Sequence, residues 1–142
     1  MTTRWVTLAA VTAALSGCGG NPEPTAAVAW QEPARYTYEL ESSCGERALI
    51  GRFRITVEQD EVTAAEGLDE SGRWFVADAR SEPVPTLGQL LDRVDRARQQ
   101  GAAIAEVTTD PADGHPTRID IDPDAGAIDD ESCFSIAGYT LE

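Results

Sequence analysis

Apolar and polar residues alternate along several short stretches of the chain, as they do in strands that bury one face. In residues 35–42 the apolar positions are Tyr36, Tyr38 and Leu40, and polar residues lie between them. The same kind of pattern predicts six further strands at residues 48–58, 59–67, 73–79, 103–109, 116–122 and 133–141. The stretch 73–79 is expected to be a short strand or a short segment at the edge of the sheet. The strands at 48–58 and 59–67 are expected to form a hairpin, because only a short polar turn separates them.

Residues 81–101 have the period of an amphipathic helix. Their apolar side chains recur at intervals of three and four positions, which places them in one stripe: Leu87, Leu90, Leu91, Val94 and Ala97. Thr86 is the expected N-cap, and Gln89 three residues later would complete a capping box. Gly101 is suited to end the helix. The stripe is expected to pack on the core.

The order of these elements predicts one small α+β domain at residues 34–142. Runs of antiparallel strands with a single helix between them place the helix on one face of the sheet. We therefore expect a curved, mostly antiparallel sheet of about six to seven strands packed on one helix. Residues 18–33, which are rich in glycine, proline and alanine, are expected to form a flexible tether before the domain.

The first residues have the pattern of a bacterial lipoprotein signal, with residues 1–17 as the signal peptide. Arg4 supplies a positive charge, and the apolar run 5–15 is shorter than the roughly 20 residues needed to span a bilayer. Leu15-Ser16-Gly17-Cys18 resembles a lipobox. In lipoproteins the cysteine becomes the new N-terminus and carries a diacylglyceryl group, often with a further chain such as palmitate. We expect Cys18 to be the lipidation site, with an ordinary cleaved signal or an uncleaved anchor as the alternatives.

The charge of the chain narrows the range of partners. There are 25 acidic residues against 11 basic ones, all arginine, for a net charge of −14. Such a chain repels nucleic acid and anionic lipid surfaces, so no nucleic-acid partner is expected. We expect a monomer in the cell envelope, outside the cytoplasmic membrane, that is attached through Cys18 and meets an envelope protein or glycan. Gly19 differs from the aspartate of inner-membrane retention signals, which favours the outer membrane where a cell has one.

The three cysteines form an odd set, which in an exported chain asks for an explanation. Lipidation of Cys18 would leave Cys44 and Cys133, and an oxidising compartment favours a disulfide between them. This disulfide would join the end of the first strand to the start of the last. A catalytic thiol is the alternative, but the chain has no CxxC motif to support it.

Acidic residues crowd the segment 120–131, with no basic residue among them. Oxygen ligands of this kind suit Ca²⁺, and the candidate ligands are Asp120, Asp122, Asp124, Asp129 and Glu131. Their spacing resembles that of an EF-hand loop, but Ala125 stands where glycine is required, and the flanking segments read as strands. The alternative is that Asp120 and Asp122 form the solvent face of a strand whose isoleucines point inward.

The sequence offers little support for catalysis. His115 is the only histidine of the chain and lies in a turn-like Gly-His-Pro stretch. The chain contains no nucleophile-elbow motif of the type G-x-S-x-G. We therefore expect a non-catalytic binding or interaction module without a cofactor. A calcium-dependent module is the first alternative, and an envelope hydrolase with paired carboxylates is the second.

Several stretches taken in order resemble one family of bacterial lipoproteins. They are RYTYELESSC, RFRITVEQDEV, PTLGQLLDRV, DGHPTRIDID and DDESCFSI, and the resemblance that they carry extends over about residues 36–141. The family is known only as domain of unknown function 6174. The sequence departs from its pattern at His115, where tyrosine is usual, and at Asp60-Glu61, where the hairpin usually has glycine. The resemblance implies a location and a fold but no activity.

Overall fold

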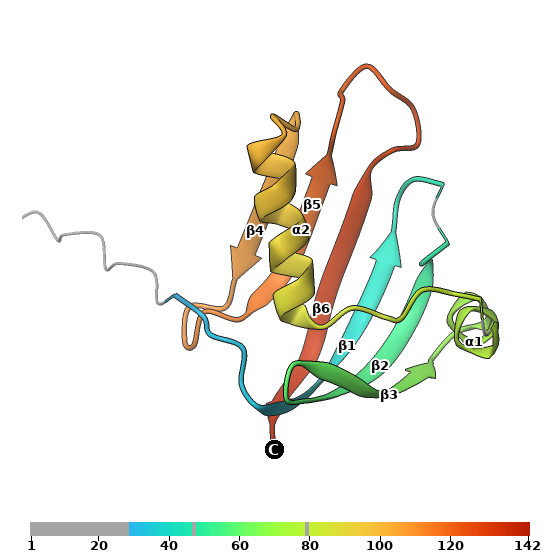
Figure 1. Cartoon of the computed structure of the whole chain (residues 1–142), viewed down its shortest axis with the longest axis vertical. Helices are drawn as coiled ribbons and strands as arrows, with labels where there is room; N and C mark the ends of the chain where they lie inside the picture. Colours follow the sequence, from blue (N-terminus) through green and yellow to red (C-terminus); the bar gives the residue numbers. More distant parts are fainter. Residues whose placement is uncertain (1–28, 47, 79) are drawn as a thin grey trace, which may run out of the picture.

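The computed structural model describes residues 29–46, 48–78 and 80–142, and Figure 1 shows the arrangement of their helices and strands. Within these residues, six strands form one antiparallel sheet in the order β3-β2-β1-β6-β5-β4. The strands are β1 (Arg35–Ser43), β2 (Gly51–Glu58), β3 (Glu61–Gly67), β4 (Ile104–Thr109), β5 (Pro116–Asp122) and β6 (Ser132–Leu141). The helices are α1 (Glu70–Ala77) and α2 (Leu87–Gln99). The small α+β domain and the β2–β3 hairpin are confirmed.

One face of the sheet packs against α2 (Figure 1). The apolar residues of the alternating patterns are buried, namely Tyr36, Tyr38 and Leu40 in β1 and Phe53, Ile55 and Val57 in β2. The stripe of α2 meets them with Leu87, Leu90, Val94 and Ala97, whereas Leu91 is only partly buried. The single core predicted from the two periodicities is therefore confirmed.

Both ends of α2 follow the sequence signals. The Thr86 hydroxyl accepts from the Gln89 amide at 3.2 Å, and the Gln89 side chain accepts from the Thr86 amide at 3.1 Å. These two bonds satisfy two of the amide groups that a helix leaves unpaired at its start. At the other end Gly101 has a φ of 77°, which glycine adopts without the steric cost that a side chain brings.

The prediction of a strand at residues 73–79 is wrong, because most of this stretch belongs to the helix α1. Asp69 is the N-cap, and its carboxylate accepts from the Gly72 amide at 2.7 Å. Phe75 is the large apolar residue that the helix buries, and its ring lies edge-on to Phe53 with centroids 5.6 Å apart. The adjacent apolar residues of this short stretch do not reveal a period, so strand and helix look alike in the sequence.

The predicted disulfide between Cys44 and Cys133 is present and joins residues 89 positions apart. Ser43 at the end of β1 pairs with Cys133 at the start of β6, so the disulfide joins the end of the first strand to the start of the last, as predicted. Cys18 lies outside the described residues. No helix in the described ranges is long and apolar enough to cross a membrane.

Candidate functional site

The acidic segment 120–131 is divided between a strand and a loop. Asp120 and Asp122 lie in β5, where they alternate with Ile119 and Ile121, which are buried on the opposite face. The guanidinium of Arg118 donates to both carboxylate oxygens of Asp120, at 2.6 and 2.7 Å. This part of the segment therefore forms the solvent face of a strand, and Asp120 has a cationic partner.

Two of the predicted calcium ligands take part in the structure of the β5–β6 loop. The Asp124 carboxylate accepts from the Gly126 amide at 2.9 Å and so stabilises the first bend of the loop. Asp129 has a φ of 66°, and its carbonyl accepts from the Glu46 amide at 2.9 Å. These contacts fix the loop against the residues that follow Cys44.

The other predicted ligands surround a shallow hollow on the open face of the sheet. The hollow has a volume of about 420 Å³, and Asp120, Asp122 and Glu131 line it together with Glu106 of β4. One oxygen of Asp122, Oδ1, is buried and has no hydrogen-bond partner among the described residues. Asp124 and Asp129 do not line this hollow.

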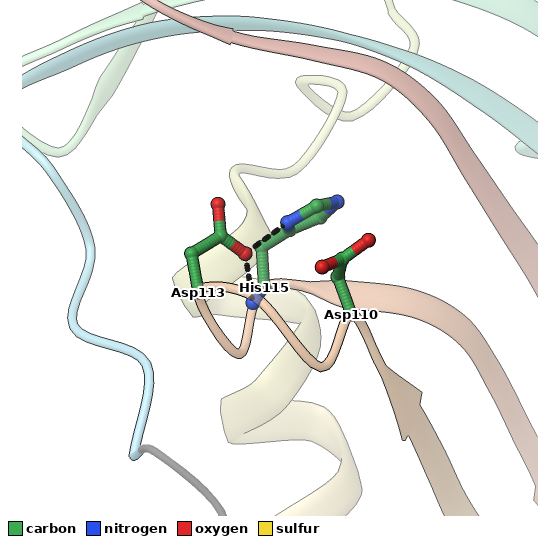
Figure 2. Close-up of side chains that lie close together, drawn as sticks. All are labelled: Asp110, Asp113 and His115. Atoms are coloured by element: carbon green, nitrogen blue, oxygen red, sulfur yellow. Dashed lines mark hydrogen bonds and ion pairs between the residues drawn. The ribbon is translucent and has the colours of Figure 1, made fainter.

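A second group of potential metal ligands lies in the turn between β4 and β5. Asp110, Asp113 and His115 each place a ligand atom within 4.8 Å of the others, and among the described residues they form the group of three that does so. Figure 2 shows their side chains on the same side of the turn, with the imidazole between the two carboxylates. That these three side chains converge was not predicted from the sequence.

The backbone of this turn holds the two carboxylates in place. The Asp110 carboxylate accepts from the Ala112 amide at 2.8 Å, and the Asp113 carboxylate accepts from the His115 amide at 3.1 Å. Gly114 has a φ of 81°, and its amide donates to the Asp110 carbonyl at 2.9 Å. Asp and Asn side chains commonly bond to the backbone two residues on in turns of this type.

The imidazole of His115 is fixed from two sides. Its Nδ1 lies 2.5 Å from Asp113 Oδ1, and this contact lowers the pKa of the Asp113 carboxyl. The ring also stacks on Tyr139 of β6, with centroids 4.2 Å apart and planes 19° from parallel. Only 13% of the His115 side chain is exposed. A proton on Nδ1 leaves Nε2 as the nitrogen that can accept a proton or bind a metal.

Aromatic side chains continue from His115 into the core. The ring centroids of Tyr139 and Tyr36 are 5.7 Å apart. Trp30 meets Tyr36 edge-on, with ring centroids 6.2 Å apart. Burial raises the pKa of Tyr36 and of Tyr38 well above the ordinary value for a phenol, so both hydroxyls are neutral at physiological pH. Tyr38 donates to the Pro85 carbonyl, which leads into α2.

The arrangement can perform only a limited chemistry. Two carboxylates and an imidazole are ligands for a divalent metal. The described residues show no nucleophile hydrogen-bonded to this imidazole. A signal was present in the sequence, because Asp110, Asp113 and His115 share one glycine-containing turn of six residues. The stacking partner Tyr139 comes from a strand 24 residues later and could not be assigned from that turn.

Comparison with known proteins addresses the family but not the activity. The family of unknown function DUF6174 matches residues 26–140, which is most of the chain. The chain belongs to this family. The match begins before Trp30 and ends after Tyr139, so it includes the aromatic cluster and the β4–β5 turn. Neither a curated protein nor a solved structure gave a significant match.

Proposed function

We propose that this DUF6174 protein is lipid-anchored in the cell envelope and acts there as a non-catalytic binding or interaction module. The observation that carries the proposal is the Cys44–Cys133 disulfide, because structural disulfides are typical of oxidising compartments outside the cytoplasm. The pairing also accounts for two of the three cysteines and leaves Cys18, which follows the signal-like segment. Lipidation gives that remaining cysteine a role.

Metabolic labelling tests the anchor. Cells that express the full chain are fed an alkyne analogue of palmitate, and the label on the protein is compared between wild type and Cys18→Ala. The double variant Cys44→Ser/Cys133→Ser is the matched control, because it also removes cysteines. We expect the wild type and the control to carry the label and to sediment with membranes, whereas Cys18→Ala does neither. An unlabelled wild type, or a label that survives in Cys18→Ala, contradicts the proposal.

A second candidate function is calcium-dependent binding through the hollow between β4, β5 and β6. The observation that favours it is the buried Oδ1 of Asp122, because an unpaired buried oxygen costs free energy that a bound cation would recover. Glu131 and Asp120 line the same hollow and would supply further oxygens. This site differs from the predicted loop, since it includes Glu106 in place of Asp124 and Asp129.

Thermal unfolding of the oxidised chain with EDTA, and then with millimolar Ca²⁺, tests this candidate. A cation that binds only the native state raises the unfolding midpoint by mass action. We expect the rise to disappear in Asp122→Asn and to persist in Glu61→Gln, which removes an exposed carboxylate from β3. An equal midpoint with EDTA and with Ca²⁺ contradicts calcium binding at this hollow.

A further inference from the structure

We propose that residues 29–33 form a releasable strap, and that its release lengthens the tether between the domain and Cys18. This inference rests on the proposed lipid anchor for its consequence, but not for the strap itself. Residues 29–33 belong to the segment for which the sequence predicts a flexible tether. In the structure they lie against the domain, and Trp30 is partly buried against the core.

Trp30 is the first of two side chains that hold the strap. Its indole Nε1 donates to the Tyr139 hydroxyl at 3.3 Å, and its ring meets Tyr36 edge-on. Indole groups that are buried on one side and hydrogen-bonded at the nitrogen make effective anchors, because they combine a large apolar surface with a directional bond. Trp30 therefore connects the strap to β1 and β6 at once.

Glu32 is the second side chain, and it binds at the start of α2. Its Oε1 accepts from the Tyr36 hydroxyl at 2.5 Å. The same hydroxyl accepts from the Leu87 amide at 3.0 Å, in the first turn of the helix. A carboxylate at this end of a helix is favoured by the helix dipole. The strap thus supplements the capping box of Thr86 from outside the helix.

Gly88 shows that α2 is shaped to receive the strap. A Cβ at this position would lie 1.8 Å from Glu32 Oε2, so any side chain there would displace the carboxylate. Glycine is a poor residue for the first turn of a helix compared with alanine. The helix therefore carries an unfavourable residue at a position where the Glu32 carboxylate approaches it, and the lack of a side chain there leaves room for that carboxylate.

The strap can detach without disturbing the sheet. Among the described residues, the hydrogen bonds found for residues 29–33 come from the side chains of Trp30 and Glu32. Main-chain bonding begins only at Ala34, whose carbonyl accepts from the Gln59 amide at 2.7 Å. Segments held by few contacts open at much lower free energy than the core to which they attach.

Release changes how far the domain can move from its anchor. With the strap docked, Ala29 follows Cys18 by 11 positions, and a chain of that length spans at most about 36–40 Å. With the strap released, the tether extends to Ala34, and five more residues add up to about 17 Å. The strap therefore gives the tether two lengths, short when Trp30 and Glu32 are docked and long when they are not.

Gly88→Ala is the variant that tests the strap, because it blocks the place of Glu32 and leaves α2 a better helix. Full chains carrying Trp5→Phe and Trp74→Phe retain Trp30 as the sole tryptophan, and acrylamide quenching then reports its exposure. We expect Gly88→Ala to lose the protection of Trp30 and to approach the quenching of the same chain unfolded in urea. Gly126→Ala, an exposed loop glycine, is the matched control and should keep the protection.

Two outcomes overturn the proposal. One is a folded Gly88→Ala chain, whatever its unfolding midpoint, that protects Trp30 from acrylamide as well as the Gly126→Ala control does. The other applies if Gly88→Ala does not fold. Glu32→Ala is then the second variant, and a Glu32→Ala chain that protects Trp30 as well as the wild type does overturns the proposed strap.

The change in reach is measured separately on vesicles. The lipidated full chain carries a donor dye on a C-terminal tag, and the bilayer contains an acceptor-labelled lipid. Gly88→Ala should transfer less energy than Gly126→Ala, and equal transfer from two vesicle-bound chains overturns the two-length tether. A chain that does not associate with vesicles in any variant contradicts the lipid anchor instead, and the quenching result for the strap stands on its own.

Discussion

Replacing Gly72 with alanine tests how closely α1 is packed on the edge of the sheet. Gly72 is buried in the first turn of α1, and a Cβ at this position would lie 2.3 Å from the carbonyl oxygen of Arg52 in β2. The Cα of Gly67 in β3 would be 3.2 Å away. Because both neighbours are backbone atoms, no rotamer change can make room, and the helix itself has to move.

The cost follows from the size of that movement. Relief of the contact requires a shift of about 1 Å, which also loosens Phe75 from its edge-on contact with Phe53. Overpacking of this kind costs about 1–3 kcal/mol. Alanine returns up to about 1 kcal/mol through its higher helix propensity. Because the clash is with backbone atoms, the overpacking cost falls in the upper part of that range, at about 2–3 kcal/mol. The expected net loss is therefore about 1–2 kcal/mol, or a midpoint lower by roughly 4–8 °C in a domain of this size.

Thermal and urea unfolding, followed by circular dichroism, measure this loss. Ser71→Ala is the matched control, because Ser71 neighbours Gly72 in the same turn but is exposed, so alanine there improves the helix without a clash. We expect the control to be as stable as the wild type or slightly more stable. A Gly72→Ala chain with the stability of the control would refute the argument that backbone contact limits this position.

Three further predictions follow from other parts of the fold. Changing Cys44 and Cys133 to serine removes a disulfide between residues 89 positions apart, and the chain-entropy relation predicts that the free energy of unfolding falls by about 4–5 kcal/mol in urea titrations. A fall of less than about 1 kcal/mol contradicts this prediction. Tyr36→Phe removes the hydroxyl that accepts from the buried Leu87 amide, so the free energy of unfolding should fall by about 1–3 kcal/mol in the same assay. An unchanged midpoint would show that another group takes the place of the hydroxyl. Hydrogen bonds from two main-chain amides lower the pKa of the Asp69 carboxyl below its ordinary value of 3.8. The charged carboxylate therefore stabilises α1 fully at pH values above 3.8, and this stabilisation is lost as the pH falls through the lowered pKa. Asp69→Asn, which caps without titrating, should make hydrogen exchange in α1 less dependent on pH in that range, and a dependence equal to wild type excludes Asp69 as the titrating group.

The elements that the sequence predicts well are those with one long buried face. In β1 the alternation of Tyr36, Tyr38 and Leu40 has a single explanation, because shifting the register would expose all three. The stripe of α2 runs over three turns and has a capping box at its start. Helix α1 offered only eight residues and buries one large side chain, Phe75, so its period could not be read. Asp69-Glu70 is the kind of acidic pair found at helix starts, but it is a weak signal beside three adjacent apolar residues that fit a strand equally well.

The candidate sites were harder to predict because their members meet through tertiary structure. Asp120, Asp122 and Glu131 follow the acidic pattern, but Glu106 joins them only because β4 pairs with β5. Similarly, the turn that contains His115 is local, whereas the ring of Tyr139 that fixes the imidazole comes from β6. A sequence pattern identifies chemically suitable residues, but strand pairing decides which of them share a surface.

The positions of the two candidate sites have different consequences for an anchored protein. Figure 1 shows the β5–β6 loop and the first described residues toward opposite ends of the sheet. Along β6, six positions separate Cys133 at the disulfide from Tyr139 at the strap, which corresponds to about 20 Å. The turn with His115 therefore lies at the end where the tether leaves, and the acidic loop lies at the far end. If Cys18 is lipidated as proposed, the tether joins the domain at the end that carries the His115 turn, and the acidic loop is at the opposite end. Release of the strap, as proposed, would then add to the distance that this end of the domain can reach from its anchor.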